Sequence, residues 1–160
     1  PDVVRALIAI GSNLGEREAL IGSAVDALSA LKGTRVLASA EAIETPPERP
    51  EDGAPFLNTA VLVDTTLPPR ALLEHLHEVE ARLGRERIRP RRGPRTIDLD
   101  LIIYEGVVRR EPGLEVPHPR FRSRRFVLEP AAQIAPQMID PVTRRSIADL
   151  LRLAPPARRS

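Results

Sequence analysis

Two aspartates, Asp98 and Asp100, stand in a run of strand-forming residues between Ile97 and Ile103. Side chains at positions i and i+2 of a strand share one face, which puts both carboxylates on the same side, roughly 7 Å apart along the strand. Magnesium suits such a pair, because it usually binds through one or two carboxylates plus substrate phosphates. From the spacing alone, an edge strand with a solvated acidic face is the more common explanation.

Six arginines precede this strand within eleven residues, and Gly93-Pro94 interrupts them. They are Arg85, Arg87, Arg89, Arg91, Arg92 and Arg95. A positive loop beside a negative strand end suits a clamp on phosphates whose oxygens also bind a metal. Without the aspartates, a solvated basic surface or a nucleic-acid patch explains the arginines about equally well. Together, the stretch from Arg91 to Asp100 predicts a magnesium-nucleotide phosphoryl-transfer site.

A further carboxylate, Glu80, falls inside the apolar arc of the helix predicted for 68–84, and His77 lies at the edge of that arc. The arc consists of Leu72, Leu73, Leu76, Val79 and Leu83. An inward carboxylate is costly unless it is paired or hydrogen-bonded. Two interpretations stay open: Glu80 lines a ligand cleft near the arginine loop, or its head reaches solvent from the last turn of the helix.

The whole sequence favours one soluble domain over residues 1–160, with a frayed tail at 155–160. It has no cysteine, which excludes a disulfide scaffold, and no apolar window long enough for a membrane span. The N-terminus lacks the pattern of a signal peptide, so we expect a cytoplasmic protein. Aromatic residues make up only 2%, which argues against a stacking platform for single-stranded nucleic acid.

The elements that must position these residues are predicted from apolar patterning. Strands are expected at 4–10, 57–65 and 96–104, with 36–43 extended, and helices at 16–31 and 68–84. Weaker helical patterns cover 122–134 and 146–153. Strands with helices on one or both faces form the simplest architecture for this order of elements.

The run from Arg91 to Ile102 resembles the signature of 6-hydroxymethyl-7,8-dihydropterin pyrophosphokinases, which are folate-pathway enzymes. The same resemblance extends to Ile8 to Leu14, Thr45-Pro46-Pro47, Phe56-Leu57-Asn58, Glu80 with Gly84-Arg85, Val116-Pro117-His118, and Arg124 with Phe126. It implies an α+β fold with a ferredoxin-like antiparallel sheet and helices packed on its faces. It also implies transfer of pyrophosphate from ATP to the pterin hydroxymethyl group, with release of AMP.

The resemblance implies a role for each matching residue on the nucleotide side. Asp98 and Asp100 would hold two Mg²⁺ ions that bridge the ATP phosphates, and Arg85 and Arg95 would be the catalytic, phosphate-clamping arginines. The remaining implied nucleotide-binding residues are His77, Glu80, Ile102, His118 and Arg124. Within that set, His118 and Arg124 would contact phosphates, whereas His77 and Glu80 would lie beside the nucleoside.

The implied pterin-binding residues are Thr45, Pro46, Phe56, Asn58, Asp98 and Phe126. Phe56 and Phe126 would sandwich the ring, while Asn58 and the backbone around Thr45 would read its polar edge. The prolines after Thr45 and the loop 84–93 would act as lids that exclude water.

The expected partners are therefore the two small substrates, with no nucleic acid and no membrane, and the protein is expected to be a monomer. One alternative from another class remains open at this point. A ferredoxin-like nucleic-acid-binding module could use the basic loop from Arg85 to Arg95 on a phosphate backbone, with steep salt dependence and no need for the aspartates.

Overall fold

The computed structural model describes residues 2–13, 16–46, 55–87 and 97–156, with only the backbone at 85–87. Five strands form an antiparallel sheet: β1 (Val4–Ser12), β2 (Thr34–Ser39), β3 (Ile43–Thr45), β4 (Phe56–Thr65) and β5 (Ile97–Tyr104). The main order is β2-β4-β1-β5, and β3 pairs with β4 beyond the end of β2. Strands β4 and β1 are therefore central, and β5 is the last strand of the order.

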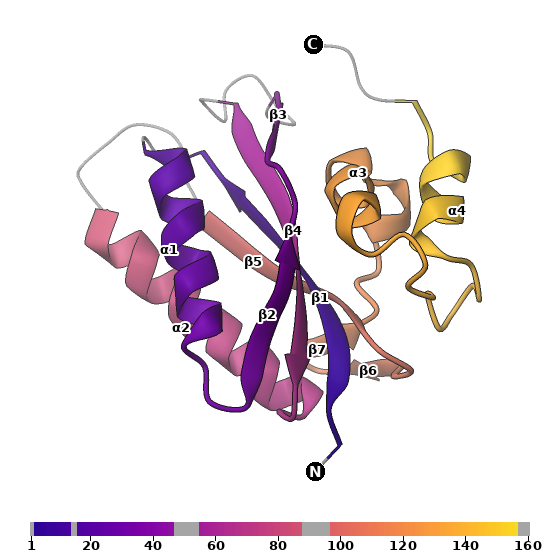
Figure 1. Cartoon of the computed structure of the whole chain (residues 1–160), viewed down its shortest axis with the longest axis horizontal. Coiled ribbons are helices and arrows are strands. Elements are labelled where there is room, and N and C mark those ends of the chain that lie inside the picture. The colour runs from indigo at the N-terminus through magenta and orange to yellow at the C-terminus, as the bar shows by residue number, and fades with distance from the viewer. Residues whose placement is uncertain (1, 14–15, 47–54, 88–96, 157–160) are drawn as a thin grey trace.

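Two helices connect the strands, α1 (Arg17–Ser29) after β1 and α2 (Pro69–Arg87) after β4. Both pack on the same face of the sheet, as Figure 1 shows. Apart from the short strand β3, the elements follow one another along the chain as β1, α1, β2, β4, α2 and β5. This succession and the sheet order β2-β4-β1-β5 are those of a ferredoxin-like fold. The predicted α+β class is confirmed.

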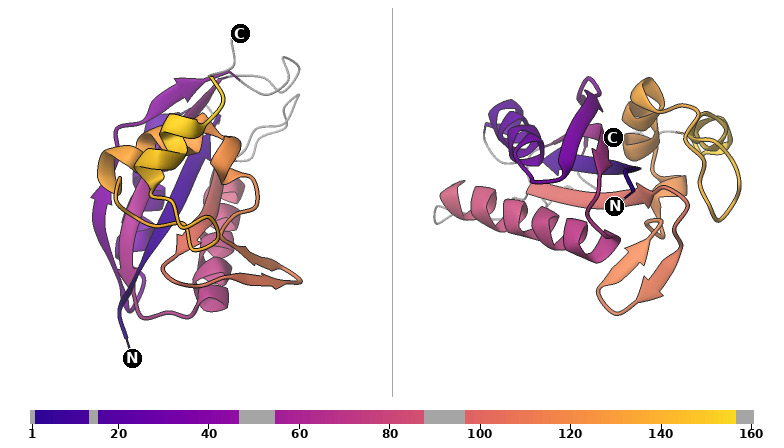
Figure 2. Two further views of the ribbon diagram at one scale, coloured as in Figure 1. Left: turned by 90° about the vertical axis from the view of Figure 1, so that its right-hand side faces the viewer. Right: turned by 60° about the horizontal axis from the view of Figure 1, so that its bottom comes forward.

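The opposite face of the sheet is covered by the C-terminal helices α3 (Arg125–Ile134) and α4 (Ile147–Leu153), which lie over the sheet in the left view of Figure 2. The central strand β1 serves both cores, because Ile8 and Ile10 belong to the core under α1 and α2, whereas Leu7 belongs to the core under α3 and α4. Burial on two faces explains why β1 reads as a nearly continuous apolar run.

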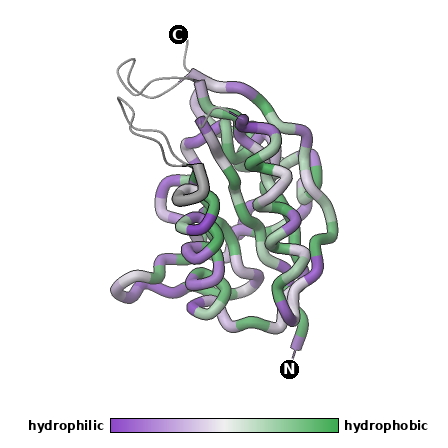
Figure 3. Tube along the Cα trace, turned by 90° about the vertical axis from the view of Figure 1, so that its left-hand side faces the viewer, coloured by the Kyte–Doolittle hydropathy of each residue, from purple (hydrophilic) through white to green (hydrophobic). Residues whose placement is uncertain are grey.

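A hairpin of β6 (Arg109–Glu111) and β7 (Leu114–Val116) follows β5, and one turn of 3-10 helix, η2 (Phe121–Ser123), leads into α3. The hairpin projects from the body, and in Figure 3 its path is mostly purple, which marks hydrophilic residues. All three residues of β6 are exposed. Among the described residues, no helix is both long enough and apolar enough to cross a lipid bilayer.

Three predicted boundaries differ from the structure. The segment 36–43 is divided between β2 and β3, and the segment 122–134 is divided between η2 and α3. Helix α2 continues through Gly84 to Arg87 instead of ending at that glycine. Gly84 does not have the positive φ of a glycine that terminates a helix, so the residue type alone was a misleading signal.

Candidate active site

The paired carboxylates lie on β5 as the spacing predicts. Ile97 and Leu99 are buried, Asp98 is exposed and Asp100 is half-buried, so the aspartates share the outward face of the strand. Within the described ranges, no three His, Cys, Asp or Glu side chains form a group that could hold a metal. Two carboxylates are nevertheless the set that Mg²⁺ uses when substrate phosphates supply further oxygens, so these donors fit the metal.

Strand register aligns Asp98 with residues of two neighbouring strands. Asp98 pairs with Gly11 of β1, and Gly11 pairs with Asn58 of β4. Since adjacent strands lie about 4.8 Å apart, the backbones at Asp98 and Asn58 are about 10 Å apart across the sheet. The three residues form one row on the same face, with glycine in the middle.

Gly11 leaves room between the two ends of this row. A Cβ at Gly11 would lie 2.8 Å from Asn58 Oδ1 and 3.7 Å from Cδ2 of Phe56. Both side chains therefore occupy the space that any larger residue at position 11 would need. This close approach gives a structural reason for a glycine inside a central strand.

The side of the site next to β4 carries the residues implied for the pterin. Asn58 is 6% exposed, and its Nδ2 donates a hydrogen bond to Thr45 Oγ1 at 2.7 Å. Thr45 pairs in register with Phe56, and Pro46 follows directly. Phe126, at the start of α3, packs against the core on this face of the sheet. The structure thus brings Thr45, Asn58 and Phe56 together and places Phe126 on the same side.

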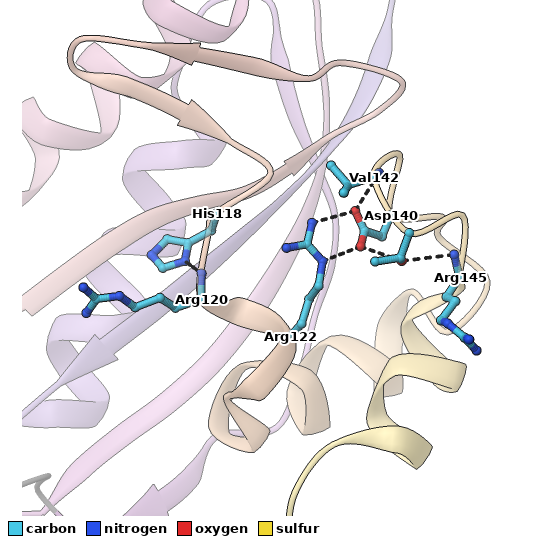
Figure 4. A network of polar contacts seen from close by, with 7 residues as sticks. His118, Arg120, Arg122, Asp140, Val142 and Arg145 are labelled. Carbon is cyan, nitrogen blue, oxygen red and sulfur yellow. Dashed lines mark hydrogen bonds and ion pairs between the residues drawn. The ribbon is translucent and has the colours of Figure 1, made fainter.

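His118 lies against the outer edge of β5. Its backbone N–H donates to the carbonyl of Ile102 at 2.8 Å, and its Nδ1 accepts the N–H of Arg120 at 3.1 Å (Figure 4). Burial lowers the pKa of His118, the charge of Asp100 opposes that change, and Arg124 adds to it. The neutral ring with Nδ1 as acceptor carries its proton on Nε2, which can donate to an anion. Ile102 itself is buried and contributes to this arrangement through its carbonyl.

The arginines around η2 have different surroundings. Arg122 forms a two-point ion pair with buried Asp140, with 2.6 Å from Nε to Oδ2 and 3.0 Å from Nη2 to Oδ1 (Figure 4). Arg125 pairs with Glu129 one turn along α3. Arg124 has no carboxylate partner in the part of the chain that the structure describes. Its guanidinium carbon lies 5.6 Å from the centre of the Phe126 ring. Its charge is therefore available for a phosphate.

Glu80 points inward from α2, as the helical spacing predicts, and contacts β5. That it also lines a ligand cleft stays a prediction. Its Oε2 accepts the backbone N–H of Leu99 at 2.7 Å, between the two aspartates of β5. Burial raises the pKa of Glu80 to about 7; the Leu99 hydrogen bond opposes this shift, while the charges of Asp98 and Asp100 add to it. His77 is exposed on the same helix.

The proposed arginine clamp falls mostly outside the described residues. Arg91, Arg92 and Arg95 lie in the range 88–96, and for Arg85 the structure gives only the helical backbone. The lid expected after Thr45 and the loop to Gly93 also lie largely outside the described ranges. These roles remain predictions.

Two features of the site were missed by sequence reasoning. Gly11 lies outside the strand predicted for 4–10 but inside β1, and a glycine inside a strand is a known signal of close approach. The Arg122–Asp140 pair joins residues eighteen positions apart, and no motif in the sequence links them.

The ferredoxin-like sheet presents two carboxylates on its edge strand, a histidine with an Nε2 donor and a buried asparagine. This set is suited to a small α+β enzyme that acts on a metal-bound nucleotide and a second small molecule. The family model described as 7,8-dihydro-6-hydroxymethylpterin-pyrophosphokinase matches residues 7–136. The chain belongs to this family, and the predicted enzyme class is confirmed.

Two bacterial relatives are named 2-amino-4-hydroxy-6-hydroxymethyldihydropteridine pyrophosphokinase. That of Methylorubrum extorquens is 44% identical over 137 residues, which cover 86% of each chain. That of Bacillus subtilis is 43% identical over 133 residues, 83% of this chain and 79% of its own. Neither name refers to nucleic-acid binding, and nothing in these comparisons supports that alternative.

A solved structure of Plasmodium falciparum HPPK-DHPS, a triple mutant with STZ-DHP, has a TM-score of 0.74 and 13% sequence identity to this chain. The match covers 95% of this chain and 43% of that longer chain. At this identity the similarity shows the fold alone.

Proposed function

We propose that this chain transfers pyrophosphate from Mg-ATP to the hydroxymethyl group of 6-hydroxymethyl-7,8-dihydropterin and releases AMP, a step of folate synthesis. The observation that carries the proposal is the row across three strands, in which Asp98 and Asn58 flank Gly11. It supports the proposal because a carboxylate suited to a metal-bound phosphate lies in the same row as a buried amide suited to the polar edge of a flat ring.

On the nucleotide side, Asp98 and Asp100 would bind two Mg²⁺ ions, which neutralise phosphate charge when bound. The neutral ring of His118 would donate a hydrogen bond from its Nε2–H to a phosphate oxygen and keep its proton. Arg124 would contact the phosphates, and Arg85 and Arg95 would stabilise the charge of the transferring group. Glu80, His77 and Ile102 would complete the nucleotide side.

On the pterin side, Phe56 and Phe126 would cover the two faces of the ring, and Asn58 with Thr45 and Pro46 would bind its polar edge. The hydroxymethyl oxygen then attacks the β-phosphorus. A new O–P bond forms as the bond from the β-phosphorus to the oxygen of the α-phosphate breaks; the hydroxyl proton is released and AMP leaves. Positioning and charge neutralisation account for the catalysis, as in other phosphoryl transfers.

All of these groups belong to one chain, so the proposal needs no second subunit, nucleic acid or membrane. We accordingly infer a monomer that acts in the cytoplasm.

Incubation with Mg-ATP and the hydroxymethyl-dihydropterin, followed by separation of the nucleotides, tests the proposal. We expect AMP and the pterin pyrophosphate in equal amounts, and no reaction when a chelator removes Mg²⁺. Formation of ADP, or no product in the presence of Mg²⁺, would reject the proposed reaction. A salt-sensitive complex with RNA or DNA and no product would favour the nucleic-acid alternative.

A further inference from the structure

The outer edge of β5 is bound by a side chain from α2 at the position between the two aspartates. Leu99 pairs in register with Ile10 of β1, and the Leu99 N–H is donated to Oε2 of Glu80, at 2.7 Å. Nineteen residues separate the two partners in sequence. The distance of 2.7 Å is that of a well-formed hydrogen bond. The amide between the two candidate metal ligands is therefore attached to α2.

Helix α2 itself is fixed against β5. Leu76, Val79 and Leu83 of α2 are buried in the same core as Leu99. Glu80 follows Val79 directly, so its backbone cannot move far without disturbing buried contacts. The carboxylate is thus attached to a rigid support and not to a loop.

We propose that Glu80 is a positioning residue, whose bond to the Leu99 N–H holds the β5 backbone so that Asp98 and Asp100 are correctly placed for Mg²⁺. This role deepens the proposed function and rests on it only for the metal-bound nucleotide that the two aspartates would hold. It adds to the contact with the nucleoside that the family resemblance implies, because the strand engages Oε2 of the same carboxylate.

The chemistry of Mg²⁺ makes this kind of support important. The ion requires near-ideal octahedral geometry with short bonds to oxygen, so small shifts of its ligands weaken binding. Partners that orient metal ligands typically change metal affinity by about 10-fold to 100-fold when they are removed. Thr45, Phe56 and Asn58, on the pterin side, belong to strands on the other side of β1 from β5.

Three variants distinguish the effect of the hydrogen bond to the Leu99 N–H from the effect of the Glu80 charge. They are Glu80→Ala, Glu80→Gln and Glu78→Ala. Glutamine keeps an acceptor oxygen but has no charge, whereas alanine lacks both. Glu78 is a matched control, because it lies on the same helix with an exposed side chain that pairs with His75. All measurements are made at pH 8, where Glu80 of the parent chain is ionised.

Two readouts are independent of turnover. Amide hydrogen exchange reports the protection of the Leu99 N–H, and electron paramagnetic resonance reports Mn²⁺ binding together with a non-hydrolysable ATP analogue. For Glu80→Ala we expect Leu99 exchange at least about 10-fold faster and Mn²⁺ affinity about 10-fold weaker. For Glu80→Gln we expect continued protection and an affinity within about threefold of the parent, and Glu78→Ala should match the parent.

Unchanged Mn²⁺ affinity in Glu80→Ala would overturn the proposal. It would also be overturned if Glu80→Gln lost affinity as fully as Glu80→Ala while the Leu99 N–H stayed protected, because charge or direct ligand contact would then be responsible. If the parent chain made no AMP but the exchange and Mn²⁺ results were as expected, the proposed function would fail and the positioning role would stand.

Discussion

At the scale of single residues, two ionisable residues form hydrogen bonds with the outer edge of β5. Burial favours the neutral form of each. Glu80 accepts the Leu99 N–H, and the His118 N–H donates to the Ile102 carbonyl. Burial raises the pKa of Glu80 to about 7 and lowers that of His118. The charge at this edge therefore depends on pH and on whatever ligand is bound.

The raised pKa of Glu80 predicts a pH dependence of stability in the absence of metal and nucleotide. The folded chain keeps the proton between pH 4.5 and about 7, where the unfolded chain has lost it. The free energy of unfolding of the parent, relative to Glu80→Gln, should thus fall as pH rises through this interval and then level off. Urea denaturation of both proteins from pH 4.5 to 8 measures the difference.

Glu74→Gln, at an exposed position of the same helix, is the control for this series, and the change of the difference with pH should be clearly larger for Glu80→Gln than for this variant. Equal behaviour of the two variants would show that burial does not raise the pKa of Glu80.

Sequence reasoning succeeded for residues whose environment follows from local spacing. The alternation around Asp98 and Asp100 was predictable because a strand has a period of two. The inward direction of Glu80 was predictable from the helical period, but its partner was not. The Leu99 amide becomes its neighbour only when α2 packs on β5.

At the scale of elements, β1 lies between Asp98 on the nucleotide side and Asn58 on the pterin side. Gly11 places no side chain between them. For Gly11→Ala, the added Cβ would meet Asn58 Oδ1 at 2.8 Å and displace the Asn58 amide from Thr45. We expect pterin affinity to fall by about 10-fold, since a buried hydrogen bond is worth about 1–3 kcal/mol when broken. Affinity for an ATP analogue should change less than about twofold. Isothermal titration with each ligand measures both.

Gly22→Ala provides the matched control, because nothing lies within 4 Å of a Cβ at this position in α1. Alanine in a helix interior should stabilise the protein by about 0.5–1 kcal/mol and leave both affinities unchanged. Equal loss of pterin and nucleotide affinity in Gly11→Ala would contradict the division of the site by β1.

Helices and strands were likewise predictable where local patterning determines them and not where packing does. The patterns for 57–65 and 96–104 identified β4 and β5 because long apolar runs leave few alternatives. The predicted end of α2 was wrong because Gly84 has an ordinary helical backbone, without the positive φ of a glycine that terminates a helix. The boundary between β2 and β3 depends on pairing with β4, which local patterning does not contain.

At the scale of the whole molecule, a C-terminal layer supports the face of the sheet that carries the site. Asp140 is fully buried and accepts hydrogen bonds from Arg122, Thr143 and the Val142 N–H. The pair joins the turn before α4 to η2, which directly precedes Arg124 (Figure 4). No sequence motif predicted this link, because it depends on how the C-terminal helices fold back.

Asp140→Asn should lower the free energy of unfolding at pH 7 by about 2–4 kcal/mol, because it leaves Arg122 without its buried counter-charge. Although burial opposes the shift, the hydrogen bonds from Arg122 and Thr143 hold the pKa of Asp140 below its usual 3.8. The stability difference is therefore present at neutral pH and should shrink as pH falls below that value. Urea denaturation at pH 7 and at acid pH measures it.

Asp149→Asn is the control, since Asp149 forms an exposed pair with Arg152 on α4. Such pairs contribute less than about 1 kcal/mol, so the variant should stay close to the parent. Equal effects at both positions would contradict the structural importance of the buried pair.

The most direct test of the proposed reaction is the rate of AMP formation by Asp98→Asn and Asp100→Asn with saturating ATP and pterin. Each amide keeps the size of the side chain but removes a charge needed for the metal, so turnover should fall at least about 100-fold, with little change in thermal stability. Asp64→Asn on β4, whose aspartate pairs with Arg35, should retain turnover near that of the parent. Near-parental AMP formation by both β5 variants would contradict the assignment of these carboxylates.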